Sequence, residues 1–319
     1  MGRKSREAMR IVVLAGGISD EREISQASGA NVATALTEAG YGVVDMMDPA
    51  DENFLSELSQ GEYDAAFIAL HGLGGEDGMI QSVLEYLHIP YTGSGVTASA
   101  CAADKDISKV LYEHAGIPIA KGVVVERGDV VDAEKLAEQL GGEMFVKPAV
   151  NGSSYGVSCV KSPSELDGAL EVAFEHGDKA LVEQRLVGTE ITVGVYEGEE
   201  LVALPVVEIR KQEGSEFYDL NVKYIDPELV HRIPAQLAPN DYARAQELAC
   251  AAHRALGCSG FSRSDFIVTH DGPVILETNT IPGMTDTSLY PDEVRHAGMK
   301  FSEVCDRLVE LALERAGLK

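Results

Sequence analysis

Residues 10 to 70 alternate between short apolar runs and segments with helical spacing. Such alternation implies a parallel sheet with helices on both faces. Asp20 and Glu23 form a capping box that starts the first helix. Ligands of such sheets bind beyond the carboxyl ends of the strands, where Gly16-Gly17 and His71-Gly72 lie. The expected elements are strands at 10–17, 41–46 and 65–70 and helices at 20–39 and 53–59.

The rest of the chain predicts further α+β structure after a boundary at Pro90–Gly95. In the middle we expect helices at 99–114, 132–140 and 163–176 and strands at 122–126, 143–147, 157–160 and 180–184. In the last third we expect a hairpin of strands 190–197 and 200–208, a helix at 240–256, a hairpin of strands 261–269 and 273–279, and a helix at 300–315. The fold class is therefore α/β and α+β, with an N-terminal parallel-sheet domain.

The charge of the chain excludes some classes of partner. Its 319 residues include 52 acidic and 26 basic side chains, a net charge of −26. Such a chain repels nucleic acids and anionic membranes, so we expect neither as a partner. Five cysteines without a CxxC pair argue against a disulfide framework or a zinc site and fit a reducing cytoplasm. An anionic substrate would require the scarce Lys and Arg residues to gather in one place.

The last two predicted strands carry the most informative pattern. Arg263 and Asp265 are two residues apart, as are Glu277 and Asn279, so each pair shares one face of its strand. A hairpin turn at Asp271-Gly272 places Asp265 roughly opposite Glu277. Three oxygen ligands without a nearby His or Cys suit Mg²⁺, especially Mg²⁺ that also binds substrate phosphates. The alternative is an exposed charged face of the sheet.

Two further segments carry lysines. Lys147 ends a predicted strand next to the Gly/Ser loop Asn151–Gly156, an arrangement that binds phosphates or forms a Gly-rich hairpin turn. It is not a Walker A sequence. Lys105 and Lys109 lie on one face of a helix, and such pairs most often form a solvated face.

The remaining patterns are ambiguous. The Gly-Gly turn near Glu21 lacks the GxGxxG pattern, which excludes a dinucleotide fingerprint and a nicotinamide dehydrogenase. The glycine-rich segment His71–Gly78 is a turn or a substrate loop. The long segment Glu213–Tyr224 is an active-site lid or a mobile connection.

Together these segments resemble the D-alanine–D-alanine ligases of the ATP-grasp superfamily, over residues 10 to 313. The motifs that carry the resemblance, in order, are GGISDEREIS (16–25), ALHGLGGEDG (69–78), PYTGSG (90–95), VKP (146–148) with GSS (152–154), FYD (217–219), KY (223–224), RSD (263–265) and ETNTIPGMT (277–285). The resemblance implies domains at 1–93, 94–184 and 185–319, with a lid at about 211–224. It implies that ATP phosphorylates one D-alanine and that a second D-alanine attacks the acyl phosphate, giving a precursor of peptidoglycan.

The resemblance also assigns roles by position. The residues implied for ATP are Lys105, Lys147, Glu183, Gln184, Leu186, Glu190 and Lys223. Those implied for two Mg²⁺ or Mn²⁺ ions are Asp265, Glu277 and Asn279. Those implied for the two D-alanines and the catalytic step are Glu21, His71, Ser153, Tyr224, Arg263, Gly283, Ser288 and Leu289. A cytoplasmic homodimer is the implied form of the enzyme.

One departure and three rivals follow from the same residues. Gln184 stands where many relatives have Lys, which removes a charge near the adenine. A D-alanine–D-lactate ligase is a rival, but Tyr224 after Lys223 argues against it. Another ATP-grasp carboxylate–amine ligase is the second rival, and a non-catalytic ATP-binding protein is the third.

Overall fold

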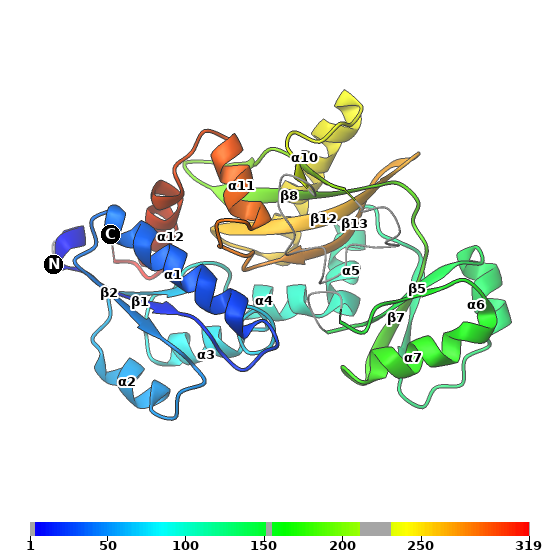
Figure 1. Ribbon diagram of the computed structural model, residues 1–319, viewed down its shortest axis with the longest axis horizontal. Helices are drawn as coiled ribbons and strands as arrows, with labels where there is room; N and C mark the ends of the chain where they lie inside the picture. The colour runs from blue at the N-terminus through cyan, green and yellow to red at the C-terminus, as the bar shows by residue number, and fades with distance from the viewer. Residues whose placement is uncertain (1–3, 151–154, 211–230, 319) are drawn as a thin grey trace.

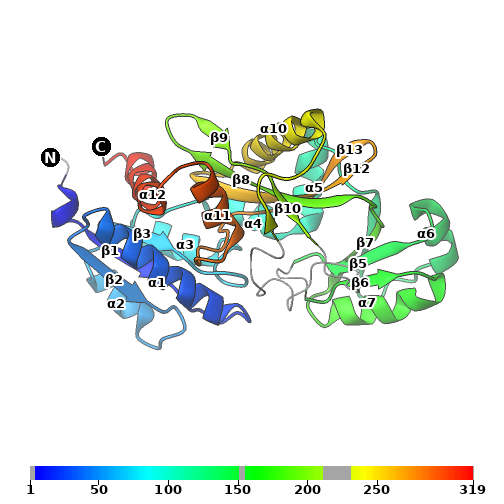
Figure 2. The same ribbon diagram turned by 45° about the horizontal axis from the view of Figure 1, so that its top comes forward.

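A computed structural model describes residues 4–150, 155–210 and 231–318. The molecule is elongated, and these described residues form three sheets. A six-stranded sheet in the middle separates the N-terminal sheet at one end from a four-stranded sheet at the other (Figures 1 and 2). None of the described helices is long and apolar enough to cross a membrane.

The N-terminal sheet confirms the predicted parallel arrangement. Its strands lie in the order β2-β1-β3, and both neighbours of β1 run parallel to it. Its elements are β1 (Arg10–Leu14), α1 (Arg22–Glu38), β2 (Val43–Met47), α2 (Phe54–Gln60), β3 (Ala65–Ile68) and α3 (Met79–Tyr86). The capping box predicted at Asp20 is wrong. Glu21 is the N-cap residue and makes no side-chain cap bond, because Ser19 already accepts the amides of Glu21 and Arg22.

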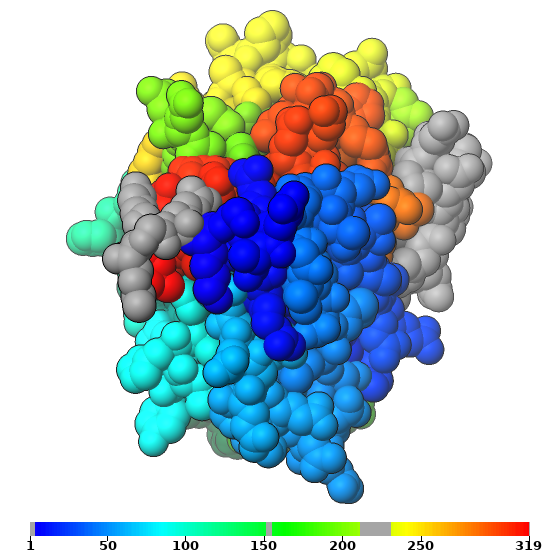
Figure 3. Space-filling model, turned by 90° about the vertical axis from the view of Figure 1, so that its left-hand side faces the viewer, coloured from blue at the N-terminus to red at the C-terminus, as the bar shows by residue number. Residues whose placement is uncertain are grey.

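The final helix completes the core of this sheet. Helix α12 (Phe301–Arg315) packs against α1 and β3. Its Leu308 and Val309 are buried in one cluster with Ile11 and Phe67. Figure 3 views this end and shows the blue N-terminal residues directly beside the orange and red C-terminal ones. Residues from the two ends of the chain therefore share one hydrophobic core.

The four-stranded sheet confirms the strands predicted for the middle of the chain. Its order is β4-β7-β5-β6, all antiparallel. Its elements are β4 (Gly122–Glu126), α6 (Ala133–Leu140), β5 (Met144–Pro148), β6 (Ser158–Val160), the 3-10 turn η2 (Pro163–Glu165), α7 (Leu166–Phe174) and β7 (Lys179–Gln184). The helix predicted over 163–176 thus begins as a 3-10 turn, and its α-helical part ends earlier, at Phe174.

One predicted helix before this sheet is wrong in a way that matters for the site. The segment expected as a helix at 99–114 forms two helices, α4 (Val96–Ala103) and α5 (Lys105–His114). They are separated by Asp104, whose backbone is extended and whose side chain accepts the amides of Asp106 and Ile107. A short polar side chain that caps a new helix favours this break. Helix α5 therefore starts at Lys105.

The six-stranded sheet has the order β11-β10-β8-β12-β13, with β9 also paired to β8. Its elements are β8 (Thr189–Glu197), β9 (Leu201–Ala203), β10 (Val207–Ile209), β11 (His231–Arg232), β12 (Phe261–Thr269) and β13 (Gly272–Asn279). The strand predicted over 200–208 is two strands, interrupted around Pro205, which cannot donate to a ladder. Helix α10 (Pro239–Leu256) covers one face, and α11 (Leu289–His296) lies beside β8.

Candidate active site

Strands β12 and β13 bring the predicted charged residues together. Asp265 lies opposite Glu277, as the sequence predicted, and Arg263 lies opposite Asn279, after a register shift between Asp265 and Phe266. The Arg263 guanidinium donates to both carboxylate oxygens of Asp265 at 3.2 Å, and the Thr192 hydroxyl also donates to Asp265. The Lys105 Nζ lies 3.0 Å from Glu277 Oε2. The alternative of a freely solvated charged face is wrong, because Arg263 and Asp265 are mostly buried and ion-paired.

The same hairpin has the donor chemistry of a divalent-metal site. Asp265 and Glu277 supply carboxylate oxygens and Asn279 an amide oxygen, the hard ligands that Mg²⁺ prefers. The Asn279 Oδ1 accepts the Ile281 amide at 2.8 Å. Within the described ranges no three His, Cys, Asp or Glu side chains form a metal-binding group. These residues therefore fit an ion that is also held by the oxygens of a bound substrate.

A second charged cluster lies between α5 and the four-stranded sheet. Glu183 on β7 is 3% exposed and contacts the ammonium groups of both Lys109 and Lys147. The Lys147 Nζ lies 2.7 Å from Glu183 Oε2. Burial alone would raise the pKa of Glu183, but the two lysines hold that pKa below its ordinary value. The solvated face expected for Lys105 and Lys109 is wrong, since both are buried.

The segment from β7 to β8 carries the other described residues implied for ATP. Gln184 ends β7, Leu186 follows it, and Glu190 lies in β8 opposite Ile267. All three implied residues are partly exposed. The segment joins the four-stranded sheet to the six-stranded sheet, so these side chains lie near the border between the two sheets.

His71 joins the N-terminal sheet to the loop after β13. Its Nε2 lies 3.0 Å from Ser28 Oγ and its Nδ1 3.2 Å from the Ile281 carbonyl oxygen. Ser28 in turn accepts the Met284 amide at 3.1 Å. Glu21 lies beside the loop that follows His71, because a Cβ added at Gly72 would come within 3.0 Å of Glu21 Oε2.

The loop between β13 and α11 holds the remaining substrate candidates. Ser288 is the N-cap residue of α11, and its hydroxyl lies 2.6 Å from Thr285 Oγ1 and accepts the Thr285 amide. A Cβ at Gly283 would lie only 2.8 Å from Ser288 Oγ. Leu289 begins the helix. The structure thus places Gly283 and Ser288 together, in the same loop whose Ile281 contacts His71.

Sequence reasoning missed Glu293, a buried carboxyl on helix α11 that faces the sheet near Arg263. Its Oε1 accepts the Gly194 amide at 2.8 Å, and Gly194 is the register partner of Arg263. Burial raises the pKa of Glu293 to about 8. The signal in the sequence was Gly194, since a glycine inside an apolar strand marks a close approach. A Cβ there would lie 2.4 Å from Glu293 Oε2.

Three predicted residues, Ser153, Lys223 and Tyr224, lie outside the described residues. The expected loop at 211–224 lies outside them as well.

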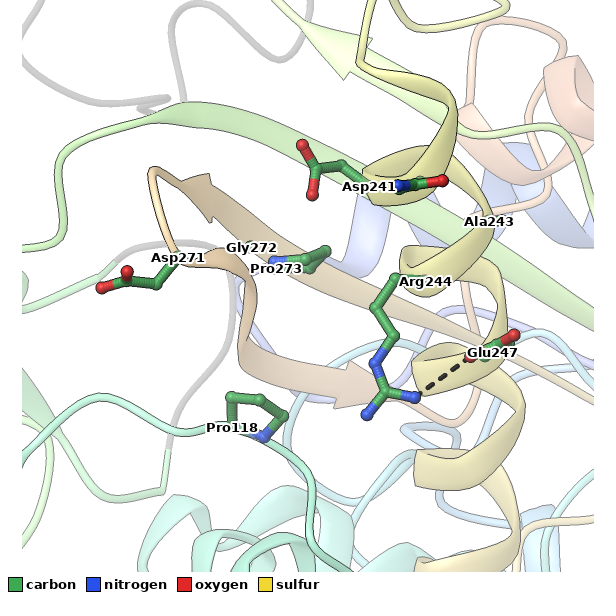
Figure 4. A pocket seen from close by; sticks show the side chains of 9 residues that line it. Pro118, Asp241, Ala243, Arg244, Glu247, Asp271, Gly272 and Pro273 are labelled. Carbon is green, nitrogen blue, oxygen red and sulfur yellow. Dashed lines mark hydrogen bonds and ion pairs between the residues drawn. The ribbon is translucent and has the colours of Figure 1, made fainter.

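A hollow of about 440 Å³ lies apart from this cluster of charges (Figure 4). It is formed by the start of α10, the β12–β13 turn and Pro118. Arg244 and Glu247 form an ion pair at its edge. None of the residues implied for substrate, nucleotide or metal lines it, so it is not the candidate site.

Comparisons with known proteins point to one family. Family models described as D-ala D-ala ligase N-terminus and C-terminus match residues 45–94 and 111–310. The D-alanine–D-alanine ligase of Syntrophobacter fumaroxidans is 45% identical over 97% of this chain and 99% of its own. That of Acidiphilium cryptum is 44% identical over 95% and 98%.

Solved structures give the same result. The crystal structure of the D-alanine–D-alanine ligase from Bacillus anthracis superposes with a TM-score of 0.85 at 33% identity, covering 97% of this chain and 99% of the other. The enzyme from Coxiella burnetii gives 0.81 at 28% identity, with 97% and 96% covered. The fold and the charged cluster therefore define an ATP-grasp protein. More narrowly, the chain belongs to the D-alanine–D-alanine ligase family.

Proposed function

We propose that the protein joins two D-alanines to D-alanyl-D-alanine at the expense of ATP. One carboxylate attacks the γ-phosphorus of ATP and gives an acyl phosphate and ADP. The amine of the second D-alanine, once deprotonated, attacks the acyl carbon, and phosphate leaves from the tetrahedral intermediate. The observation that carries the proposal is that His71 and Ser28 both contact the loop directly after β13, His71 at the Ile281 carbonyl oxygen and Ser28 at the Met284 amide. These contacts lie next to the charged hairpin, where the proposal puts the first D-alanine.

The nucleotide would lie between the four-stranded and six-stranded sheets. Lys105 and Lys147 supply positive charge for its phosphates, and Lys223 is assigned there by position. Gln184, Leu186 and Glu190 line the connection on which the adenosine would lie, with Glu183 behind them. This division corresponds to three domains, at 1–93, 94–184 and 185–319. Phosphoryl transfer depends on positioning and charge neutralisation, which such a set of cations provides.

Asp265, Glu277 and Asn279 would hold two Mg²⁺ or Mn²⁺ ions, which neutralise the charge of the phosphates during transfer. In the structure Lys105 pairs with Glu277, and Arg263 pairs with Asp265. With the ions bound to these carboxylates, Lys105 would face the nucleotide and Arg263 the acyl phosphate. Arg263 and the Gly283 amide would stabilise the oxyanion that forms when the amine attacks.

The two D-alanines would bind on either side of the acyl carbon. Glu21 would hold the ammonium group of the first, with His71 near its carboxylate, and Ser153 and Tyr224 would orient it. Ser288 and Leu289 would hold the second D-alanine.

The decisive experiment measures ADP and phosphate release with D-alanine, ATP and Mg²⁺, and identifies the product by mass. The dipeptide and equal amounts of ADP and phosphate are expected. Product formation only when D-lactate is added would assign the ester-forming rival, and nucleotide binding without turnover on any amino acid would assign the non-catalytic one. The proposal includes a homodimer acting in the cytoplasm, where ATP is available, which sedimentation and cell fractionation would test.

A further inference from the structure

Helix α5 sends two lysines to two different carboxylates. Lys105 reaches Glu277 on β13, whereas Lys109, one turn later, reaches Glu183 on β7. Lys147 on β5 contacts the same Glu183 carboxylate from the other side. Glu183 is therefore shared by two ammonium groups. Lys109 has no role in the reaction described above.

The shared cluster is almost completely buried. Glu183 is 3% exposed and Lys109 8%, and the side chain of Lys147 is 13% exposed. Burial lowers the pKa of Lys109, and repulsion from Lys147 and Lys105 adds to this, although Glu183 opposes it. Removing the partner of a buried carboxylate destabilises the protein strongly, because the charge is then neither hydrated nor paired. Glu183 thus needs at least one cation at all times.

We propose that Lys109 is a positioning residue of the nucleotide site, an inference that rests on the proposed function. In the structure the Lys147 ammonium is paired with Glu183, yet the proposed reaction requires that ammonium at a phosphate. Two cations on one carboxylate allow one to leave. Lys109 keeps Glu183 ionised and in place while Lys147 turns toward the bound nucleotide. Without Lys109, any movement of Lys147 leaves Glu183 buried and unpaired, and nucleotide binding weakens.

The chain offers a matched control between the same two elements. Lys179 on β7 pairs with Asp104 and Asp106 around the start of α5, at 3.2 and 3.1 Å. In these ion pairs the cation is on β7 and the carboxylates are at the start of α5, the reverse of the Lys109–Glu183 pair. The side chains involved are 22–33% exposed. Among the ion pairs of the described residues, none joins Lys179, Asp104 or Asp106 to Glu183 or Lys147. A variant without these ion pairs shows how a weaker attachment of α5 to β7 alone changes nucleotide affinity.

The test compares Lys109→Met, Lys109→Arg and Lys179→Met. We expect K109M to raise the KM for ATP and the Kd for ADP, measured by calorimetry without D-alanine, by about tenfold or more. The KM for D-alanine should stay unchanged. K109R should retain most of the affinity, and K179M should bind nucleotide as the wild type does. Unchanged ADP affinity in K109M, or an equal loss in K179M, overturns the inference.

A double variant covers the case in which K109M folds poorly. If Lys109 acts through Glu183, then adding K109M to Glu183→Gln changes the ADP affinity far less than adding it to the wild type does. Independent, multiplicative losses would contradict this coupling. Failure of the proposed function is distinguishable. In that case the wild type forms no D-alanyl-D-alanine in the product assay, whereas failure of the inference alone leaves a wild type that makes the dipeptide and a K109M variant that binds ADP as tightly as the wild type does.

Discussion

At the scale of single residues, Glu277 faces two demands. It stands opposite Asp265 in the ladder and pairs with Lys105. Glu277→Gln keeps the shape and removes the charge, so we expect turnover to fall by roughly 10²-fold or more and the Mg²⁺ requirement to rise. Phosphate release over a Mg²⁺ titration measures both.

Glu303→Gln is the control for that variant, because Glu303 forms an exposed ion pair with Lys300 far from the hairpin. It should leave turnover at the wild-type level. Turnover by E277Q equal to that of E303Q would refute the metal assignment.

Glu293 makes stability depend on pH. Burial raises its pKa from 4.5 to about 8 in the folded protein. Between these values the native state holds a proton that the unfolded chain releases, so the free energy of unfolding falls as the pH rises. Glu293→Gln removes this pH dependence. The free energy of unfolding of the variant should therefore rise relative to that of the wild type by roughly 3–5 kcal/mol between pH 4.5 and 8.

Urea unfolding of both proteins at several pH values in this range checks the difference. Two curves that stay parallel would show that Glu293 titrates normally in the folded protein.

At the scale of elements, the β12–β13 hairpin was predictable from the sequence. Strand periodicity predicted the shared faces, and the turn at Asp271-Gly272 placed Asp265 roughly opposite Glu277. The observed pairing depends on a register shift between Asp265 and Phe266, which the sequence did not predict. The break between α4 and α5 was not predicted, because apolar and small residues continue through Cys101 and Ala103 with helical spacing. The cap at Asp104 is joined there by a tertiary contact that the sequence does not show, in which the Lys105 amide donates to the Ala149 carbonyl oxygen.

The cap at Asp104 positions Lys105 and Lys109, so Asp104→Ala should affect both stability and the nucleotide site. We expect a loss of about 1 kcal/mol from the cap, increased by the lost pair with Lys179, and a raised KM for ATP. Thermal unfolding and steady-state kinetics measure the two effects.

Asp132→Ala is the matched comparison. Asp132 caps α6 through the Lys135 amide and lies outside the candidate site. It should lose a similar cap energy with no change in the KM for ATP. A raised KM in both variants would mean that general loosening, not the position of α5, weakens the site.

At the scale of the whole molecule, the sequence predicted the parallel N-terminal sheet and the two hairpin regions, because their patterns are local. It did not predict that Lys109 and Lys147 share Glu183, or that Glu293 lies beside Arg263. Those contacts join segments far apart in the chain, and only packing decides which charged side chains become buried. The roles of the site residues came from the resemblance, and their assignment stays a prediction.

The net charge of −26 belongs to this scale as well. The cations are few, and several of them lie in the interior of the site. The acidic side chains on the surface therefore repel one another. Salt screens such repulsion over a Debye length of about 10 Å at 0.1 M. We expect the melting temperature to rise with salt, equally in NaCl and KCl. A melting temperature that is constant or falls would show that the acidic excess costs the fold nothing.

The packing of α12 against β3 and α1 has a consequence for how the protein is made. A ribosome delivers β1, β2 and β3 long before it delivers α12. Until then Ile11, Phe67 and their neighbours lack the apolar cover of Leu308 and Val309. The first unit to be synthesised is therefore among the last to finish folding, and chaperones have the longest access to it.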